Sequence, residues 1–197
     1  MKQGVMCMAR RSKQEMLETR AAILASARKV FAQQGYAKTS MDDLTAQVGL
    51  TRGALYHHFS DKKAVFEAVV DQLDQEMDQR LQQQYLLAED SWHGFQNRCQ
   101  LFLAMAQEQE IQRIILQDAP AVLLADENKQ KCISSLQNIL AELIEQKKII
   151  QCDVEVFSRF IHGSLTELAF WISHADQQRL VKAQQSLSLI FEHLAFH

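Results

Sequence analysis

The chain has 197 residues, of which 47% are hydrophobic and 23% charged, an ordinary composition for a globular protein of one or two domains. Its one Pro and six Gly argue against a strand-rich fold with many tight turns and favour long helices. The net charge of −3 by itself argues against a nucleic-acid partner, and no apolar run reaches the roughly 18 residues of a membrane span.

The first long helix is expected to begin at about Lys13, after a flexible polar tail over residues 1–12. From there apolar residues recur at the i, i+3/i+4 spacing of one helix face. That face is formed by Leu17, Ala21, Leu24, Ala27 and Phe31. Gly35 follows it and suits the left-handed conformation that commonly ends a helix.

Two short helices are predicted between residues 40 and 60. Ser40 and Asp43 match the S-x-x-[DE] start signal of a helix, which Gly49 then ends. Thr51 can cap a second helix directly after this turn. Two short helices joined by a glycine-containing turn form a helix-turn-helix.

The sequence after residue 60 also shows the apolar periodicity of helices. Ser60 or Asp61 can cap a helix from about Lys62 to Gln84, and residues 82–91 are the best candidate for a loop or linker. Further helices are expected over 91–108, 110–126 with an interruption near Pro120, 128–148, 153–175 and 177–195. The predicted fold class is therefore all-α, with about nine helices.

The second helix of a helix-turn-helix lies in the DNA major groove, and its first residues reach the bases. Here it begins with Arg52, which can bind a guanine edge or a phosphate, and with Gly53, which permits close approach to DNA. Ala54 can contact a thymine methyl group. Tyr56 and His57 lie away from the apolar positions of this helix, so they are expected to point outward.

Hydroxyl groups and lysines around this helix are expected to contact phosphates. The full candidate DNA-binding set is Thr39, Ser40, Thr51, Arg52, Gly53, Ala54, Tyr56, His57, His58, Lys62 and Lys63. Residues 1–63 carry a net charge of +6 and residues 64–197 a net charge of −9, as expected when only the N-terminal part meets an anionic partner. The alternative is a solvated polar surface on a helical hairpin.

The segment from Thr39 to Val70 resembles the DNA-binding segment of TetR-family transcriptional repressors, and the resemblance covers about residues 13–70. The family pattern is a Thr/Ser-headed helix, a Gly turn, and then Gly-x-Leu-Tyr-x-His-Phe-x-x-Lys. It is filled here by Ser40, Gly49, Gly53, Leu55, Tyr56, His58, Phe59 and Lys62. Lys63 departs from the pattern, because the family often has Glu there.

The resemblance implies an all-α homodimer that binds operator DNA through an N-terminal three-helix domain, residues 13–60. It also implies a C-terminal domain, residues 61–197, that binds a small-molecule effector and dimerises through its last two helices. Repression is the common mode in the family, and ligand binding moves the fourth helix. No cofactor is expected, and the protein is expected to be cytoplasmic without a membrane partner.

The effector pocket is expected to be largely apolar and adaptable. Its candidate residues are Leu73, Met77, Trp92, Phe95, Phe102, Met105, Ile114, Leu116 and Trp171. The candidate dimer interface is formed by Phe157, Ile161, Gly163, Ser164, Leu165, Leu168, Leu187, Ile190, Phe191 and Leu194. The alternative for both sets is that their members form the core of a single chain.

Other chemistry has weaker support in the sequence. His162 and His174 can bond a ligand or lie in the core, and His193 and His197 have the i, i+4 spacing of metal ligands at a helix end. Four scattered cysteines, at 7, 99, 132 and 152, suit free thiols and leave open a redox-responsive or architectural DNA binder. An enzyme is not expected, because no catalytic or nucleotide-binding motif is present.

Overall fold

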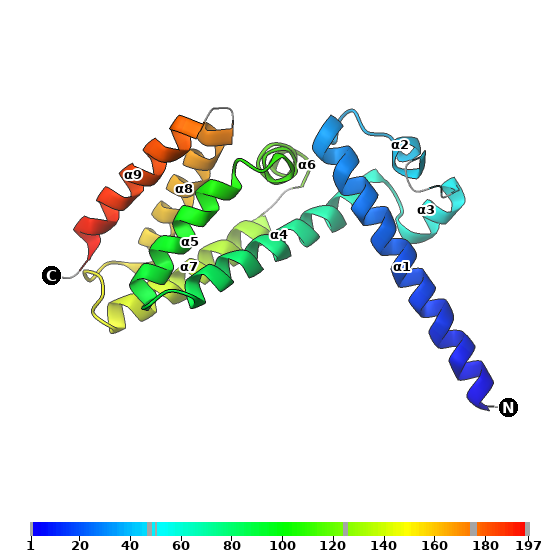
Figure 1. Ribbon diagram of the computed structural model, residues 1–197, viewed down its shortest axis with the longest axis horizontal. Coiled ribbons are helices and arrows are strands. Elements are labelled where there is room, and N and C mark those ends of the chain that lie inside the picture. The colour runs from blue at the N-terminus through cyan, green and yellow to red at the C-terminus, as the bar shows by residue number, and fades with distance from the viewer. Residues whose placement is uncertain (1, 47–48, 50, 124–125, 174–176, 196–197) are drawn as a thin grey trace. The chain divides into compact units, whose positions relative to one another are not determined.

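The computed structural model describes residues 2–46, 49, 51–123, 126–173 and 177–195, with side chains from residue 14 onward except at 126–128 and 173. In this part of the chain there are nine α-helices and one π-helix, so the predicted all-α class is confirmed. The helices belong to two compact units, Met1–Gln72 and Leu73–His197, and the division falls within α4 (Lys62–Leu86) (Figure 1). None of the described helices has the length and apolar character needed to cross a membrane.

The first unit contains α1 (Lys2–Gln34), α2 (Met41–Ala46), α3 (Arg52–His58) and the first turns of α4. Helix α1 begins at Lys2, so the backbone of residues 2–12, expected to be a flexible tail, continues the helix. Its buried face is formed by Ile23, Leu24, Ala27, Val30 and Phe31. Leu17 and Ala21, predicted on that face, are exposed, because the buried stripe begins only at Ile23.

Local signals define the ends of the short helices. Gly35 and Gly49 adopt φ angles of 77° and 64°, the left-handed region that favours glycine. The Asp43 carboxylate accepts from the Ser40 backbone N–H at 2.7 Å, and the Ser40 Oγ accepts from the Asp43 N–H at 3.2 Å, which completes the predicted capping box. Asp61, one of the two predicted caps of α4, accepts from the Ala64 N–H at 2.8 Å.

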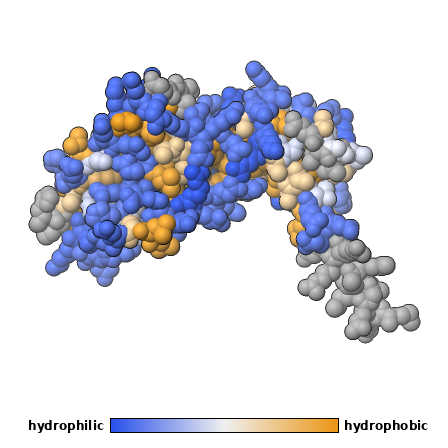
Figure 2. All heavy atoms as spheres, viewed as in Figure 1, coloured by the Kyte–Doolittle hydropathy of each residue, from blue (hydrophilic) through white to orange (hydrophobic). Residues whose placement is uncertain are grey.

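The second unit contains the rest of α4 together with six further helices. These are α5 (Ser91–Met105), η1 (Ile111–Asp118), α6 (Ala119–Val122), α7 (Asp126–Glu145), α8 (Val154–Ser173) and α9 (Gln177–Leu194). Helices α5, α7, α8 and α9 pack side by side around one apolar core (Figure 1). The interruption predicted near Pro120 lies where η1 gives way to α6. Figure 2 shows a largely hydrophilic surface with hydrophobic side chains in separate patches.

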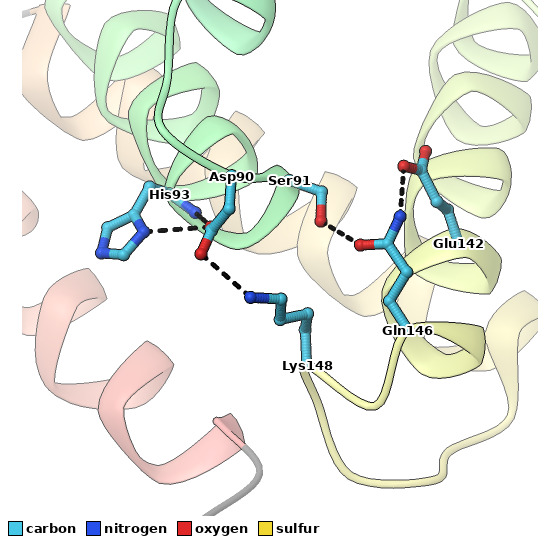
Figure 3. A network of polar contacts seen from close by, with 6 residues as sticks. All are labelled: Asp90, Ser91, His93, Glu142, Gln146 and Lys148. Atoms are coloured by element: carbon cyan, nitrogen blue, oxygen red, sulfur yellow. Dashed lines mark hydrogen bonds and ion pairs between the residues drawn. The ribbon is translucent and has the colours of Figure 1, made fainter.

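Polar contacts join the start of α5 to the segment after α7 (Figure 3). Asp90 caps α5 by accepting from the His93 backbone N–H at 2.9 Å, and its other oxygen pairs with Lys148 Nζ at 3.0 Å. These two interactions hold the pKa of Asp90 well below its ordinary value. Gly94 follows in the first turn of α5, where a Cβ atom would lie only 2.7 Å from the Tyr85 carbonyl oxygen, so α5 approaches the end of α4 closely because this residue is glycine.

Candidate nucleic-acid interface

Helix α3 presents one apolar and one polar face. Thr51 caps it by accepting from the Ala54 N–H at 3.2 Å, and Leu55, 1% exposed, anchors its inner side. Tyr56 is 48% exposed on the other side, and His57 is exposed beside it. The helix therefore displays the polar face that the sequence predicts.

Arg52 is held in place by an exposed ion pair across the helix-turn-helix. Its Nε lies 2.8 Å from Asp42 Oδ1, with the two side chains 63% and 64% exposed. Exposed pairs of this kind contribute about 0–1 kcal/mol, so Arg52 can exchange its carboxylate partner for another anion at little cost. Asp42 thus orients the guanidinium at the start of α3 and leaves it available.

The packing of the chain around Gly53 does not require a glycine at this position. Its backbone is helical, and a Cβ atom would find only Thr51 Oγ1, at 4.0 Å, within contact range. Glycine within a helix costs about 1 kcal/mol relative to alanine. Because internal packing does not explain this cost, the open space over Gly53 is suited to close approach by an external partner.

Lys62 is the first residue of α4, as expected, but its ammonium group is engaged within the chain. Its Nζ donates to the carbonyl oxygens of Tyr36 at 2.9 Å and Thr39 at 2.8 Å, and it lies 4.2 Å from the centroid of the Tyr36 ring. The expected phosphate contact stays a prediction, and these bonds give Lys62 a structural role that the sequence did not indicate. The ammonium group links α4 to the segment before α2, since these carbonyl groups fall between α1 and α2.

Two of the expected phosphate-binding hydroxyl groups are also used inside the protein. Thr39 is 3% exposed and its hydroxyl donates to the Gly35 carbonyl at 2.8 Å. The Ser40 hydroxyl donates to the Asp43 carboxylate at 2.6 Å, and this bond lowers the pKa of Asp43. Thr51 Oγ1 accepts from the Ala54 N–H, and among the described contacts its own proton has no acceptor, so it can donate to a phosphate.

The remaining candidates surround α3. Lys63 is exposed and pairs loosely with Glu67, 3.7 Å away on the next turn of α4. His58 and Ala54 are half-buried, and the rings of His57 and His58 meet edge to face at 5.6 Å. Together with Arg52 and Tyr56, these groups offer the cationic, hydroxyl and imidazole donors that contact phosphates and base edges.

Most of the residues predicted to line an effector pocket are buried side chains of the second unit. Met77, Trp92, Phe95, Met105 and Leu116 belong to its continuous core, which the alternative interpretation expected. Leu73 and Ile114 are also buried, and Phe102 is half-buried against the core. Trp171 instead is 40% exposed, with the Arg179 guanidinium 5.1 Å from its ring centroid.

A groove of about 630 Å³ lies elsewhere in the second unit, between α4, α5 and α7. It is lined by Asp78, Gln79, Gln82, Gln83, Leu86, Leu87, Arg98 and Ser135. None of these residues was among the sequence candidates. The available signal was Arg98 itself, a charged residue three positions after Phe95 on the apolar stripe of α5.

The predicted dimer residues divide between the core and the surface. Ile161, Leu165, Leu187 and Phe191 are buried within the chain itself, so for these four the expected interface role is corrected. Phe157, Leu168 and Leu194 pack partly against the same core, and Ser164 is half-buried. Gly163 and Ile190 are exposed. The exposed apolar residues of α8 and α9 are Val156, Phe160, Trp171, Val181, Leu189 and Ile190.

The histidine and cysteine candidates give no assembled site in the described residues. No group of three or more His, Cys, Asp or Glu side chains is close enough there to hold a metal ion. Burial lowers the pKa of His162, and burial raises the pKa of Cys99 to about 12. Burial also raises the pKa of Cys152 and, together with Asp78 and Asp74, that of Cys132. His174, His197 and the side chain of Cys7 lie outside the described residues.

Two family models match this chain. Residues 23–69 match the model of bacterial regulatory proteins of the tetR family, which covers α2, α3 and their flanking helices. Residues 92–194 match the model of the tetracyclin repressor-like C-terminal domain. The two matches fall on the two compact units and include the candidate interface on α3.

Curated relatives share the N-terminal part. The chain is 41% identical over 71 residues to the HTH-type transcriptional regulator TtgR of Pseudomonas putida, which is 36% of this chain and 34% of that protein. It is 47% identical over 62 residues to the regulator AcrR of Shigella flexneri, 32% of this chain and 29% of that protein. The chain therefore spans about a third of the length of the curated relatives it matches.

Solved structures extend the likeness to both units. A TetR-family transcriptional regulator from Pectobacterium atrosepticum is 49% identical, with 93% of this chain and 97% of that chain covered and a TM-score of 0.83. The fatty acid degradation regulator FadR from Bacillus halodurans has a TM-score of 0.73 over 85% of this chain and 93% of that chain. At 18% identity, this second likeness shows a common fold alone.

Proposed function

The chain belongs to the TetR family of bacterial transcriptional regulators, and from that premise we propose that it is a homodimeric repressor that binds operator DNA through α3 and leaves it when a small molecule binds. The observation that carries the proposal is the polar face at the start of α3. Arg52 is exposed and can exchange its partner Asp42 for another anion, and the space over Gly53 is open. A first helical turn with these properties suits entry into a major groove.

Exposed apolar side chains on the last two helices support assembly as a dimer. Phe160 on α8 is 56% exposed and Leu189 on α9 is 58% exposed, which is unfavourable for surface residues that remain in water. A two-fold dimer joined there reads two half-sites about 34–36 Å apart, or a multiple of that spacing, on one side of the duplex. Operator affinity then depends on the distance between the two copies of α3.

Helix α4 offers a route from an effector to the DNA-binding helices. It contributes residues to both units, and its first residue, Lys62, bonds the carbonyl groups of Tyr36 and Thr39 just before α2. A ligand that shifts the later turns of α4 therefore also pulls on the segment before α2. A hundredfold loss of operator affinity requires about 2.7 kcal/mol of coupling, which is within the usual allosteric range.

Two alternatives were open from the sequence. A thiol with a depressed pKa favours a redox-responsive regulator, whereas burial raises the pKa of Cys99, Cys132 and Cys152, the cysteines whose side chains the structure describes. A purely architectural DNA binder would lack release by a ligand. An enzyme would lack sequence-specific DNA binding altogether, and the family supports a regulator.

DNA binding can be tested without knowing the operator. A sequence is first selected from a random duplex pool by the purified protein, and affinities are then measured by fluorescence anisotropy at several salt concentrations. Arg52→Ala should lose about 1–3 kcal/mol of discrimination at one base position. Lys63→Ala, a neighbouring charge removal, should leave base preference unchanged. Failure to select any sequence, or identical base preference in Arg52→Ala and wild type, contradicts the assigned role of α3.

A further inference from the structure

The groove between α4, α5 and α7 contains a cation at its base. Arg98 is only 8% exposed, whereas most arginines remain at the surface unless they are paired. Its Nη2 donates to Ser135 Oγ at 3.3 Å, and both residues line the groove. A guanidinium group has five N–H donors, so this long bond, the one that Arg98 forms with the described residues, uses little of its capacity.

Arg98 also has no carboxylate partner among the described residues. Asp78 lines the same groove, yet it forms no ion pair with Arg98 and is itself exposed to solvent. Removing a cation from water without pairing it costs several kcal/mol. An anion that enters the groove would offset part of this cost, because it would supply both the missing charge and the missing acceptors.

The rest of the groove is suited to an organic molecule. Leu86 and Leu87 are 69% and 74% exposed, and they give the groove an apolar edge. Gln79, Gln82 and Gln83 supply amide groups along α4. The volume of about 630 Å³ falls within the usual range for small-molecule sites. An occupant therefore has one anionic end and one apolar end.

We propose that this groove binds a small organic carboxylate, with the carboxylate on Arg98 and Ser135 and the apolar body against Leu86 and Leu87. A carboxylate matches the planar guanidinium through two parallel hydrogen bonds. Calling this molecule the effector rests on the proposed function above, whereas its binding does not. The groove lies along α4, the helix through which the effector is proposed to act.

Isothermal titration calorimetry on the full chain tests the charge requirement. The probes are 3-phenylpropionate, octanoate and the matching neutral alcohols, 3-phenylpropanol and octanol. We expect the carboxylates to bind at least about tenfold more tightly than their alcohols, since about 1.4 kcal/mol of ion pairing suffices. Arg98→Gln should abolish this preference. Arg159→Gln, which removes an exposed cation of α8 and changes the net charge equally, should keep it.

Stability measurements separate a ligand site from a structural role. Without ligand, Arg98→Met should melt within about 2 °C of wild type or above it, because an unpaired buried charge is replaced by an apolar chain. If Arg98 instead stabilises the fold through Ser135, Arg98→Met and Ser135→Ala will both melt several degrees lower. That result overturns the proposal, as does equal binding of carboxylates and alcohols or no binding of any probe.

The two proposals fail in different experiments. If the protein binds its operator but none of the carboxylates, the regulator function is supported and the carboxylate site is overturned. If carboxylates bind through Arg98 but leave operator affinity unchanged, the site is supported and its proposed role in releasing the protein from DNA is overturned. Loss of operator affinity on adding 3-phenylpropionate or octanoate to wild type, but not to Arg98→Gln, supports both.

Discussion

Replacement of Lys62 by alanine should destabilise the first unit. The ammonium group donates to two backbone carbonyl groups at 2.9 and 2.8 Å and lies over the Tyr36 ring at 4.2 Å. These contacts join α4 to a segment 23 and 26 residues earlier in the chain. The variant therefore loses long-range contacts that fix the segment leading into α2.

The magnitude follows from the contacts. A hydrogen bond from a charged group contributes about 1.5–3 kcal/mol, and a cation–π contact at a partly exposed site about 0.5–1 kcal/mol. Lys62 is half-buried, so water replaces part of what is lost. We expect a net loss of about 2–3 kcal/mol in the unfolding free energy of the first unit.

The assay must distinguish the two units. Both tryptophans, Trp92 and Trp171, lie in the second unit, so their fluorescence reports its unfolding. Hydrogen exchange measured on peptides from α2 and α3 reports the first unit. In the regime where the exchange rate reports the equilibrium between closed and open states, exchange in α2 and α3 should be about 30- to 150-fold faster in Lys62→Ala. This factor corresponds to the expected loss of about 2–3 kcal/mol in unfolding free energy. The tryptophan transition should remain unchanged.

Lys63→Ala is the matched control, because this neighbour makes only an exposed pair with Glu67 and should lose less than about 0.5 kcal/mol. The reasoning is refuted if Lys62→Ala leaves exchange in α2 and α3 unchanged while the salt dependence of DNA binding falls by about one phosphate contact. Lys62 would then be a phosphate ligand after all.

Two further outcomes are expected. Gly163→Arg should yield monomers in light scattering, because the space over Gly163 admits a side chain within one chain but not between two packed chains. The monomer should be at least as stable as that of wild type, because the variant removes a helical glycine. A stable dimer would place the interface elsewhere. Asp90→Ala should lower the unfolding free energy by about 1 kcal/mol at neutral pH through loss of the α5 cap. Because the pKa of Asp90 is lowered in the folded chain, its charge contributes fully to stability above the unfolded pKa of about 3.9. This contribution is lost as the pH falls towards the folded pKa, so the difference in melting temperature between wild type and variant should shrink at pH 3. A difference independent of pH would contradict the role of the charge.

Helix positions and helix starts were predictable because they depend on neighbours within one turn. The caps at Ser40, Thr51 and Asp61 all act on a residue three positions later. Such bonds are fixed by helix geometry once the residue types are given. The glycine turn at Gly49 belongs to the same class, since only its own φ angle is involved.

The apolar residues of α8 and α9 show where this local information ends. Periodicity identified both helices as amphipathic, but it could not assign Ile161 and Phe191 to the chain's own core and Phe160 to its surface. That assignment depends on which neighbours the helix packs against. Candidate pocket residues such as Phe95 and Met105 lie in the continuous core for the same reason, because a core and an apolar ligand site have the same composition.

The sequence by itself determined the all-α class, the helix-turn-helix and the exposed face of α3, since period, caps and turn residues act over three or four positions. Tertiary structure alone decided what Lys62 and Arg98 do. Lys62 bonds carbonyl groups more than twenty residues away, and Arg98 reaches Ser135, 37 residues along the chain. The sequence of a lysine or arginine is the same whether its charge meets a phosphate, a carbonyl group or a hydroxyl group in a groove. Only packing brings one of these within reach of the charge.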